Sequence, residues 1–310
     1  MQSDIQNRRI RERHDARTGW AFMAPFFIMF LLVFAVPICV AIYQSFFRQV
    51  ASGGGLYGGG ELKNQFVGLE NFTMVITSGQ FWSGMGRVVV YAAFQIPIMI
   101  ISALVLALVL DSFLIRRVGF FRLTYFLPFA IPGIVAAMVW LYIYTPELSP
   151  IVKFFDSLGI HIDFMAAGAP ILASMANMTT WTYTGYNMLI FLAALQAVPH
   201  ELYEAARLDG ASSWQIVRQI KIPMVSGAAL LAVLLSIIGT IQLFNEPAVM
   251  QSANGWMGNA YTPMMMAYNT MFGQISPGGD GPASAISIVM ALVAGGLAVI
   301  YALLQRKTVR

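Results

Sequence analysis

Long apolar runs separated by shorter polar segments dominate the pattern of the chain. A membrane-spanning helix needs roughly 20 mostly apolar residues, because it crosses hydrocarbon about 30 Å thick at about 1.5 Å per residue. Helices are expected here, because a helix satisfies its own backbone hydrogen bonds in lipid. The pattern therefore predicts an all-α membrane protein with six transmembrane helices, at residues 20–43, 87–110, 123–144, 171–195, 225–249 and 283–304.

Composition favours several membrane spans over one large soluble core. The chain has 310 residues, of which 58% are apolar and 10% are charged, whereas soluble domains are about half apolar and about a quarter charged. The net charge of only +4 gives no reason to expect a nucleic-acid partner. The single cysteine, Cys39, lies in the first apolar run, which excludes a disulfide framework and a cysteine metal cluster.

The basic residues predict the orientation of the spans. If both termini are cytoplasmic, 14 of the 18 Lys and Arg residues fall on cytoplasmic segments, that is, all but Arg48, Lys63, Arg87 and Lys153. The first apolar run is too long for a signal peptide and has no convincing cleavage site. We therefore expect a basic cytoplasmic N-terminus at 1–19, a six-span transmembrane domain at 20–310 and a cytoplasmic C-terminus.

The segments assigned to the outside differ in character from one another. Residues 51–60, ASGGGLYGGG, are rich in glycine and are expected to form a mobile loop. Residues 145–170 contain a stretch that favours a short surface helix. Residues 250–282 are rich in turn-forming residues.

One charged segment interrupts the apolar pattern at residues 201–223, ELYEAARLDGASSWQIVRQIKIP. It carries six charges in 23 residues. The residues before Gly210 are good helix formers, and Ala211-Ser212-Ser213 offers an N-cap for a second helix that Pro223 would end. Trp214, Ile216, Val217 and Ile220 would form its apolar face. We expect two short helices, hinged at Gly210, on the cytoplasmic surface. The physical properties of these residues alone favour an amphipathic segment that only anchors the neighbouring spans.

The spacing within this segment resembles a known motif. Glu204-Ala205-Ala206, three residues, Gly210, nine residues, Ile220, one residue and Ile222-Pro223 follow the EAA pattern of ABC-importer permeases, with Ile222 where leucine is usual. The triplet at 209–211, Asp-Gly-Ala, resembles the sugar-importing branch. Residues 20–47, 189–199, 241–250 and 262–288 also resemble the larger, first permease subunit of maltose-type carbohydrate uptake systems. The resemblance covers nearly the whole chain and is most specific at 186–250.

The resemblance implies a fold, an activity and a set of partners. The fold would be that of type I ABC importer permeases, and the chain would form the pathway for a sugar or oligosaccharide delivered by an extracytoplasmic solute-binding protein. A second permease and two ATPase subunits, which bind ATP and Mg, would complete the assembly in the bacterial cytoplasmic membrane. Residues 196–224 would be the coupling loop that docks on an ATPase. Glu204 is the first candidate for a polar contact with that ATPase. The loop positions that carry this resemblance are Glu204, Ala205, Ala206, Asp209, Gly210, Ala211, Ile220 and Pro223.

A polar and aromatic stretch in the fourth predicted span is a candidate for the solute pathway. Residues 179–187, TTWTYTGYN, lie where a lipid-facing helix would be apolar. Tyr183, Tyr186 and Asn187 share a helical face, so that rings could stack on a sugar while hydroxyl and amide groups bond its hydroxyls. Such residues also hold membrane helices together, and the residues alone leave the two interpretations even. The family's sugar-contacting positions on this span align with Tyr183 and Tyr186, which favours the pathway.

The fifth predicted span ends in a second polar cluster. Gln242 and Glu246 are four residues apart and would share a helical face, with Asn245 beside them. Pro247 cannot donate a backbone hydrogen bond and is expected to loosen the helix and free a carbonyl group. Glu246 is the only carboxylate placed within a span. Near the outer end of that span it would either serve the pathway or an outer gate, or simply be hydrated.

Other function classes find less support in the sequence. It contains no GxxxxGK[ST] phosphate loop, so ATP hydrolysis is expected on a separate subunit, with no cofactor or metal on this chain. His14, His161 and His200 fall on separate segments and form no recognisable catalytic arrangement, so the chain is not expected to be an enzyme. An ion-coupled transporter usually buries several ionisable groups or shows inverted repeats. Which sugar is carried stays open, as does a related polar solute such as glycerol phosphate.

Overall fold

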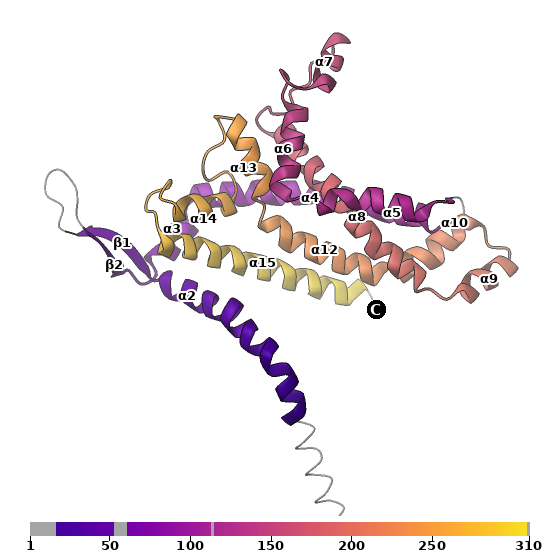
Figure 1. The fold of residues 1–310 in the computed structure, drawn as a ribbon, viewed down its shortest axis with the longest axis horizontal. Helices are drawn as coiled ribbons and strands as arrows, with labels where there is room; N and C mark the ends of the chain where they lie inside the picture. The colour runs from indigo at the N-terminus through magenta and orange to yellow at the C-terminus, as the bar shows by residue number, and fades with distance from the viewer. Residues whose placement is uncertain (1–16, 53–60, 113–114, 309–310) are drawn as a thin grey trace, which may run out of the picture.

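The computed structural model describes residues 17–52, 61–112 and 115–308. Figure 1 shows an elongated helical body in which α4 (Gly79–Leu110), α12 (Ser226–Ile241) and α15 (Asp280–Thr308) run along the long axis. The fourth long helix, α8 (Ala169–Gln196), packs along α4. Helices therefore occupy the stretches predicted at 87–110, 171–195 and 283–304, and they begin two to eight residues before the predicted starts.

The first apolar run forms one long helix that diverges from this body. The helix extends over Arg17–Gln44 and contains a π-helical turn, η1 (Leu31–Ala35), followed by α2 (Val36–Gln44). Its most apolar part has no residue buried within the chain, and Figure 1 shows it pointing away from the other helices. α2 joins it to the body by packing on α15. An apolar helix without protein cover needs lipid or a partner helix around it.

A β-hairpin follows this helix and departs from the all-α prediction. Strands β1 (Phe47–Ser52) and β2 (Glu61–Phe66) pair antiparallel, with Phe47 opposite Phe66. The buried side chain of Asn71, in α3 (Glu70–Thr77), accepts hydrogen bonds from Arg48 and donates to the carbonyl oxygens of Ser45 and Phe47. This one amide therefore fixes the base of the hairpin. Most of the glycine-rich loop predicted at 51–60 lies outside the described residues.

The third predicted span is a bent pair of helices, so the prediction of one continuous helix at 123–144 is wrong. α5 (Val118–Phe126) leads into a 3-10 turn, η2 (Leu127–Ala130), and α6 (Gly133–Tyr144) leaves it at 96°. Pro132 explains the bend, because proline forces the residue before it out of the helical region. Ile131 accordingly has ψ of 132°. Beyond α6, the short helix expected within 145–170 is α7 (Pro150–Ser157).

The fifth predicted span is also interrupted, which corrects the prediction of one helix at 225–249. α12 ends at Ile241, and α13 (Asn245–Ala253) begins after a break of three residues. Pro247 has no N–H to offer the carbonyl of Leu243, four residues earlier. That carbonyl instead accepts a hydrogen bond of 2.9 Å from the hydroxyl of Thr262, which caps α14 (Pro263–Met271). Pro247 thus frees a carbonyl group, as predicted. The break itself lies at residues 242–244, before the proline, and was not predicted.

Helix length and composition do not by themselves establish six spans. Among the described residues, three helices are long and apolar enough to cross a membrane, and two bent pairs bring this number to five. α8 has 28 residues and is long enough, but its polar stretch makes it less apolar than the others.

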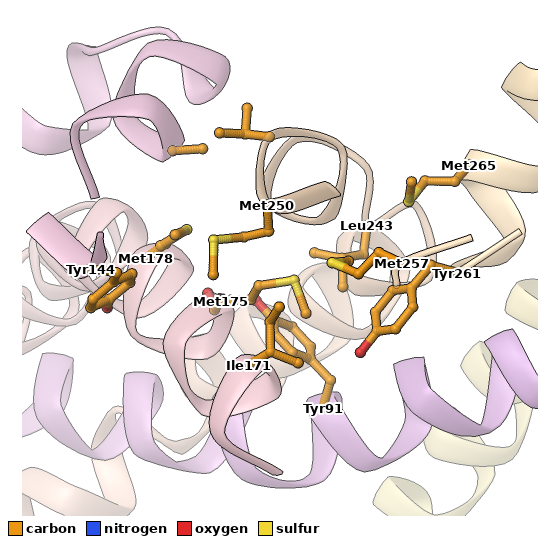
Figure 2. Packing of buried hydrophobic residues seen from close by; sticks show 12 residues of the cluster. Tyr91, Tyr144, Ile171, Met175, Met178, Leu243, Met250, Met257, Tyr261 and Met265 are labelled. Carbon is orange, nitrogen blue, oxygen red and sulfur yellow. Dashed lines mark hydrogen bonds between the residues drawn. The ribbon is translucent and has the colours of Figure 1, made fainter. Parts of the chain in front are cut away.

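Methionines fill much of the core between α4, α6, α8, α13 and α14. The largest buried cluster contains Met175, Met178, Met250, Met257 and Met265 beside three tyrosines. Figure 2 shows these side chains gathered between the ribbons, with the ring of one tyrosine, from α4, next to the helix α8. Methionine is flexible and polarisable, and it fills gaps of irregular shape. Such a core suits helices that meet at breaks and bends.

Gly185 lets α5 approach α8 closely, which gives a test of this packing. A Cβ at this position would overlap the carbonyl group of Tyr125. We expect Gly185→Ala to destabilise the protein by about 1–3 kcal/mol through overpacking and to lower the Tm of the purified protein in detergent. Gly86→Ala is the matched control, because a Cβ there meets no atom within 4 Å. Equal Tm values for the two variants would contradict this packing.

Candidate functional site

A cavity of about 240 Å³ lies between α4, α8, α12 and the start of α13. All six residues predicted for the solute pathway line it: Tyr183, Tyr186, Asn187, Gln242, Asn245 and Glu246. The two predicted clusters lie about 60 residues apart in the chain and belong to different helices. The structure therefore brings them together at one place.

Two tyrosines of α8 line the cavity, and an aromatic ring from outside α8 packs against both. The ring of Tyr186 stacks on Phe129 with centroids 4.6 Å apart, and Tyr183 meets the same ring at 5.6 Å. Asn187 is buried and donates a hydrogen bond of 2.9 Å to the carbonyl oxygen of Tyr183. Phe129 belongs to the 3-10 turn η2, and the sequence alone does not indicate its role. The neighbouring Pro128, which favours a turn, is the only local signal there.

The opposite wall is the interrupted end of the fifth predicted span. Gln242 is the C-cap of α12, while Asn245 and Glu246 lie in the first turn of α13. The prediction that Gln242 and Glu246 share one face of a continuous helix is therefore wrong, because the break between α12 and α13 separates the two residues. The Asn245 side chain lies against Gly133 at the start of α6, where a Cβ would be 2.6 Å from its amide nitrogen.

A chain of hydroxyl hydrogen bonds connects this wall to α8 and α4. The hydroxyl of Tyr91 donates to Thr179 Oγ1 at 2.6 Å, and Thr179 Oγ1 donates to Glu246 Oε1 at 2.7 Å. The positive end of the α13 helix dipole also favours a negative charge in its first turn. Glu246 is thus half-buried and hydrogen-bonded rather than freely hydrated. Tyr91 has no signal in the sequence, because its single hydroxyl lies in an apolar run.

The lining of the cavity suits noncovalent recognition. Hydroxyl and amide groups can bond a polar solute, and the tyrosine rings can cover an apolar face of it. In the part of the chain that the structure describes, no group of three or more His, Cys, Asp or Glu residues is placed to hold a metal ion.

The charged segment forms two short helical pieces, as predicted. α9 (His200–Leu208) ends before Gly210, which has a φ of +81° that favours glycine. The second piece begins with a capping box, in which Ser212 Oγ accepts from Gln215 N and Gln215 Oε1 accepts from Ser212 N. Figure 1 places α9 and α10 (Ser213–Ile216) at the opposite end of the body from the hairpin.

The end of the second piece differs from the prediction. Pro223 does not terminate it. A π-helical turn, η3 (Val217–Lys221), precedes α11 (Ile222–Met224), and Pro223 lies inside α11. The chain then bends by 57° into α12. The π-turn accommodates the missing proline N–H, as such irregularities commonly do in helices.

The surface of the loop is both charged and apolar. Glu204, Ala205 and Asp209 are exposed. Leu208 and Trp214 are 89% and 68% exposed, whereas Ile216, on the same predicted apolar face as Trp214, is buried. Large apolar side chains exposed beside charges are typical of a protein interface.

An ion pair fastens the loop to the end of α4. Lys221 Nζ lies 2.6 Å from Asp111 Oδ2, and both side chains are at most 16% exposed. The Lys221 ammonium also lies 5.3 Å from the centre of the Tyr203 ring. Burial raises the pKa of the Tyr203 hydroxyl, and the negative charge of Asp111 raises it further. The three residues come from α9, η3 and the C-cap of α4, and the sequence does not indicate that they meet.

Comparison with known proteins identifies the family. The family model described as "Binding-protein-dependent transport system inner membrane component" matches residues 78–310. The chain is 30% identical to the lactose transport system permease protein LacF of Rhizobium radiobacter over 268 residues, which are 84% of this chain and 85% of LacF. It is 27% identical to the trehalose/maltose transport system permease protein MalF of Thermococcus litoralis, over 93% of each chain.

The fold agrees with this assignment. A chain of a bacterial ABC transporter involved in the import of the acidic polysaccharide alginate superposes with a TM-score of 0.76, over 97% of this chain and 100% of that one, at 18% identity. The fold is therefore that of type I ABC importer permeases, as the EAA-like spacing at 204–223 implies. The chain belongs to the family of inner-membrane components of binding-protein-dependent transport systems.

Proposed function

We propose that this chain is the permease subunit of an ATP-driven importer and that its cavity forms part of the pathway for a sugar. The observation that carries the proposal is the meeting of Tyr183, Tyr186 and Asn187 with Gln242, Asn245 and Glu246 around one cavity. Rings beside hydroxyl and amide groups match the alternating apolar faces and hydroxyls of a saccharide. The names of the relatives, which transport lactose and trehalose or maltose, support the same solute class.

We place the protein in the bacterial cytoplasmic membrane with six spans and both termini in the cytoplasm. The spans are the helix Arg17–Gln44, α4, the bent pair α5–α6, α8, α12 with its approach from the loop, and α15. Length and composition give up to five candidate spans among the described residues. We count α8 as the sixth, because its polar stretch faces the cavity rather than lipid. The excess of Lys and Arg on the segments then assigned to the cytoplasm supports this orientation.

The loop at 196–224 is the contact through which an ATPase drives the permease. α8 leads into α9, and α10 to α11 lead into α12, so the loop connects the two helices that face each other across the cavity. The surface offered for docking comprises Glu204, Ala205, Ala206, Asp209, Gly210, Ala211, Ile220 and Pro223, with Leu208 and Trp214 exposed beside them. The chain has no phosphate loop, so two separate ATPase subunits would bind ATP and Mg and this chain would catalyse no reaction. A second permease and an extracytoplasmic solute-binding protein complete the assembly.

Lys221 and Asp111 extend this contact to a third helix. Their buried ion pair ties the second helical piece to the C-terminal end of α4, which carries Tyr91 at the cavity. A push on the loop therefore reaches α4, α8 and α12 together. Rigid elements joined in this way move as a unit, which a flexible tether would not do.

The proposed function predicts the partners and the energy source. The tagged chain, expressed with its complete operon, should copurify with one further permease and an ATPase. Uptake of labelled lactose, trehalose, maltose and glucose by these cells should stop when ATP is depleted and should survive an ionophore that collapses the ion gradients. Uptake that stops with the ionophore but not with ATP depletion would indicate an ion-coupled transporter instead.

The hinge at Gly210 gives a test of coupling. Gly210→Val should reduce uptake at least tenfold, because a β-branched residue cannot readily adopt the positive φ of this position. Gly210→Asn is the matched control and should retain more uptake, because asparagine tolerates this region better than other side chains. Both variants are compared for uptake and for copurifying ATPase. Normal uptake by Gly210→Val would contradict the assigned role of the hinge.

The ion pair between Lys221 and Asp111 gives a second test. Lys221→Met leaves the Asp111 carboxylate without its partner, which is costly for a mostly buried charge. We expect the reconstituted transporter to hydrolyse ATP while it transports several-fold less solute per ATP. Lys221→Arg keeps the charge and should stay close to the native ratio. The same ratio of transport to hydrolysis in native protein and Lys221→Met would show that the pair has no part in coupling.

A further inference from the structure

The cavity contains one charged side chain among those that line it in the described part of the chain. Glu246 is a carboxylate, and every other described residue of the lining is uncharged. The other polar side chains of the lining are uncharged: the amides are Gln95, Asn187, Gln242 and Asn245, and the hydroxyls are Tyr91, Thr179, Tyr183, Tyr186, Ser236 and Thr240. No lysine or arginine among the described residues contributes to this lining. The wall that this chain supplies therefore contains one carboxyl group and, among the described residues, no cationic side chain.

Two features beside Glu246 favour a carboxylate and fix its position. Thr179 donates a hydrogen bond of 2.7 Å to Oε1, and Tyr91 supports Thr179 in turn. The first turn of α13 adds the positive end of a helix dipole. An ionised carboxylate can only accept hydrogen bonds, so it matches the hydroxyl and amino groups of a solute and repels a carboxylate, sulfate or phosphate.

The strength of this repulsion depends on the medium. Two like charges repel each other several times more strongly in a partly buried site than in bulk water. An anionic solute in this cavity would face Glu246 without a cation from the same wall to offset it. Rejecting a competitor by placing a like charge in the site is an established route to specificity.

We infer that this transporter carries neutral or amino-bearing saccharides, that it excludes saccharides with carboxylate or phosphate groups, and that Glu246 is the residue that sets this selection. The inference rests on the proposed function and deepens it. The inferred selection differs from the solutes for which two kinds of similar protein are named. Some relatives are named for sn-glycerol-3-phosphate transport, and a structural neighbour is involved in the import of the acidic polysaccharide alginate. The cavity volume of about 240 Å³ is below the roughly 300–1,000 Å³ of pockets for drug-sized ligands, so one or two sugar rings would occupy it at a time.

The experiment first measures uptake by the complete native transporter, with its own binding protein. The probes are three sets: glucose with glucosamine and glucuronate, lactose with its oxidised form lactobionate, and sn-glycerol-3-phosphate alone. We expect transport of at least one neutral or amino probe and none of the anionic ones. Efficient transport of glucuronate, lactobionate or glycerol phosphate by the native protein would overturn the inference about selection. It would not refute the proposed function as a permease. No transport of any saccharide would instead refute the proposed function itself.

Variants of this chain then assign the selection to Glu246. The binding protein is unchanged between variants, so a change in the uptake ratio of an anionic probe to its neutral counterpart reports on the permease. We expect Glu246→Gln to raise this ratio about tenfold, and Glu246→Asp, which keeps the charge, to leave it near the native value. An unchanged ratio in Glu246→Gln would overturn the assignment.

Two controls separate charge from packing and assembly. Thr179→Val removes the hydrogen bond to Glu246 but keeps the carboxylate, so it should lower the uptake of both probes without changing their ratio. Asp156→Asn makes the same change from carboxylate to amide on α7, outside the cavity, and should also leave the ratio unchanged. The amount of assembled transporter is measured for every variant by copurification. A ratio that rises equally in Asp156→Asn and Glu246→Gln would show a general effect of charge and refute the role of Glu246.

Discussion

The cavity lies where the fifth predicted span is broken, and this break needs a substitute for the backbone hydrogen bonds that it removes. Within a membrane such groups must be satisfied inside the protein. At the end of α12, the hydroxyl of Thr262 takes the place of the N–H that Pro247 lacks. The series Tyr91, Thr179 and Glu246 then links α4, α8 and α13 across the same region. These side-chain hydrogen bonds connect the broken end of the fifth predicted span to α4, α8 and α14 beside the cavity.

The two breaks also serve the recognition surface directly. The bend between α5 and α6 places Phe129 against Tyr183 and Tyr186, so a residue of the 3-10 turn orients both rings. The break after α12 points the start of α13 at the cavity, with its carboxylate and amide. Irregular backbone at membrane depth is tolerated where it lines a cavity. Pro132 and Pro247 thus shape the surroundings of the cavity, beside the residues that line it.

Local chemistry explains how much of this could be predicted. The turn at Gly210 and the N-cap at Ser212 depend on neighbours a few residues away, and both were predicted correctly. The shared face of Tyr183, Tyr186 and Asn187 follows from helical periodicity, and it holds because α8 is continuous. The contacts that lie beyond prediction join distant segments. Examples are the pair Lys221–Asp111, which is 110 residues apart in the chain, and the hydrogen bond between Thr179 and Glu246.

The wrong predictions have two physical causes. Apolar runs at 123–144 and 225–249 satisfy the requirement for a span, yet hydropathy does not register a proline that breaks the ladder of hydrogen bonds. The hairpin at 47–66 was missed because its strands, FRQVAS and ELKNQF, lack a regular alternation of apolar and polar residues. Its position depends instead on the buried amide of Asn71. Both kinds of error concern backbone groups rather than side-chain hydrophobicity.

The connectivity explains how a movement of the loop at 196–224 would reshape the cavity. Tyr183, Tyr186 and Asn187 lie roughly 14–20 Å from the C-terminal end of α8, and Gln242 lies roughly 24 Å from the start of α12, at about 1.5 Å per residue. Both ends lead directly into the loop. A tilt of about 10° at the loop would displace the far end of a 20 Å helix by about 3.5 Å, which is comparable to the length of a hydrogen bond. Because α8 and α12 line the cavity and flank the loop, such a tilt would change the distance between the tyrosines and Glu246, and the methionine core could repack as it did so.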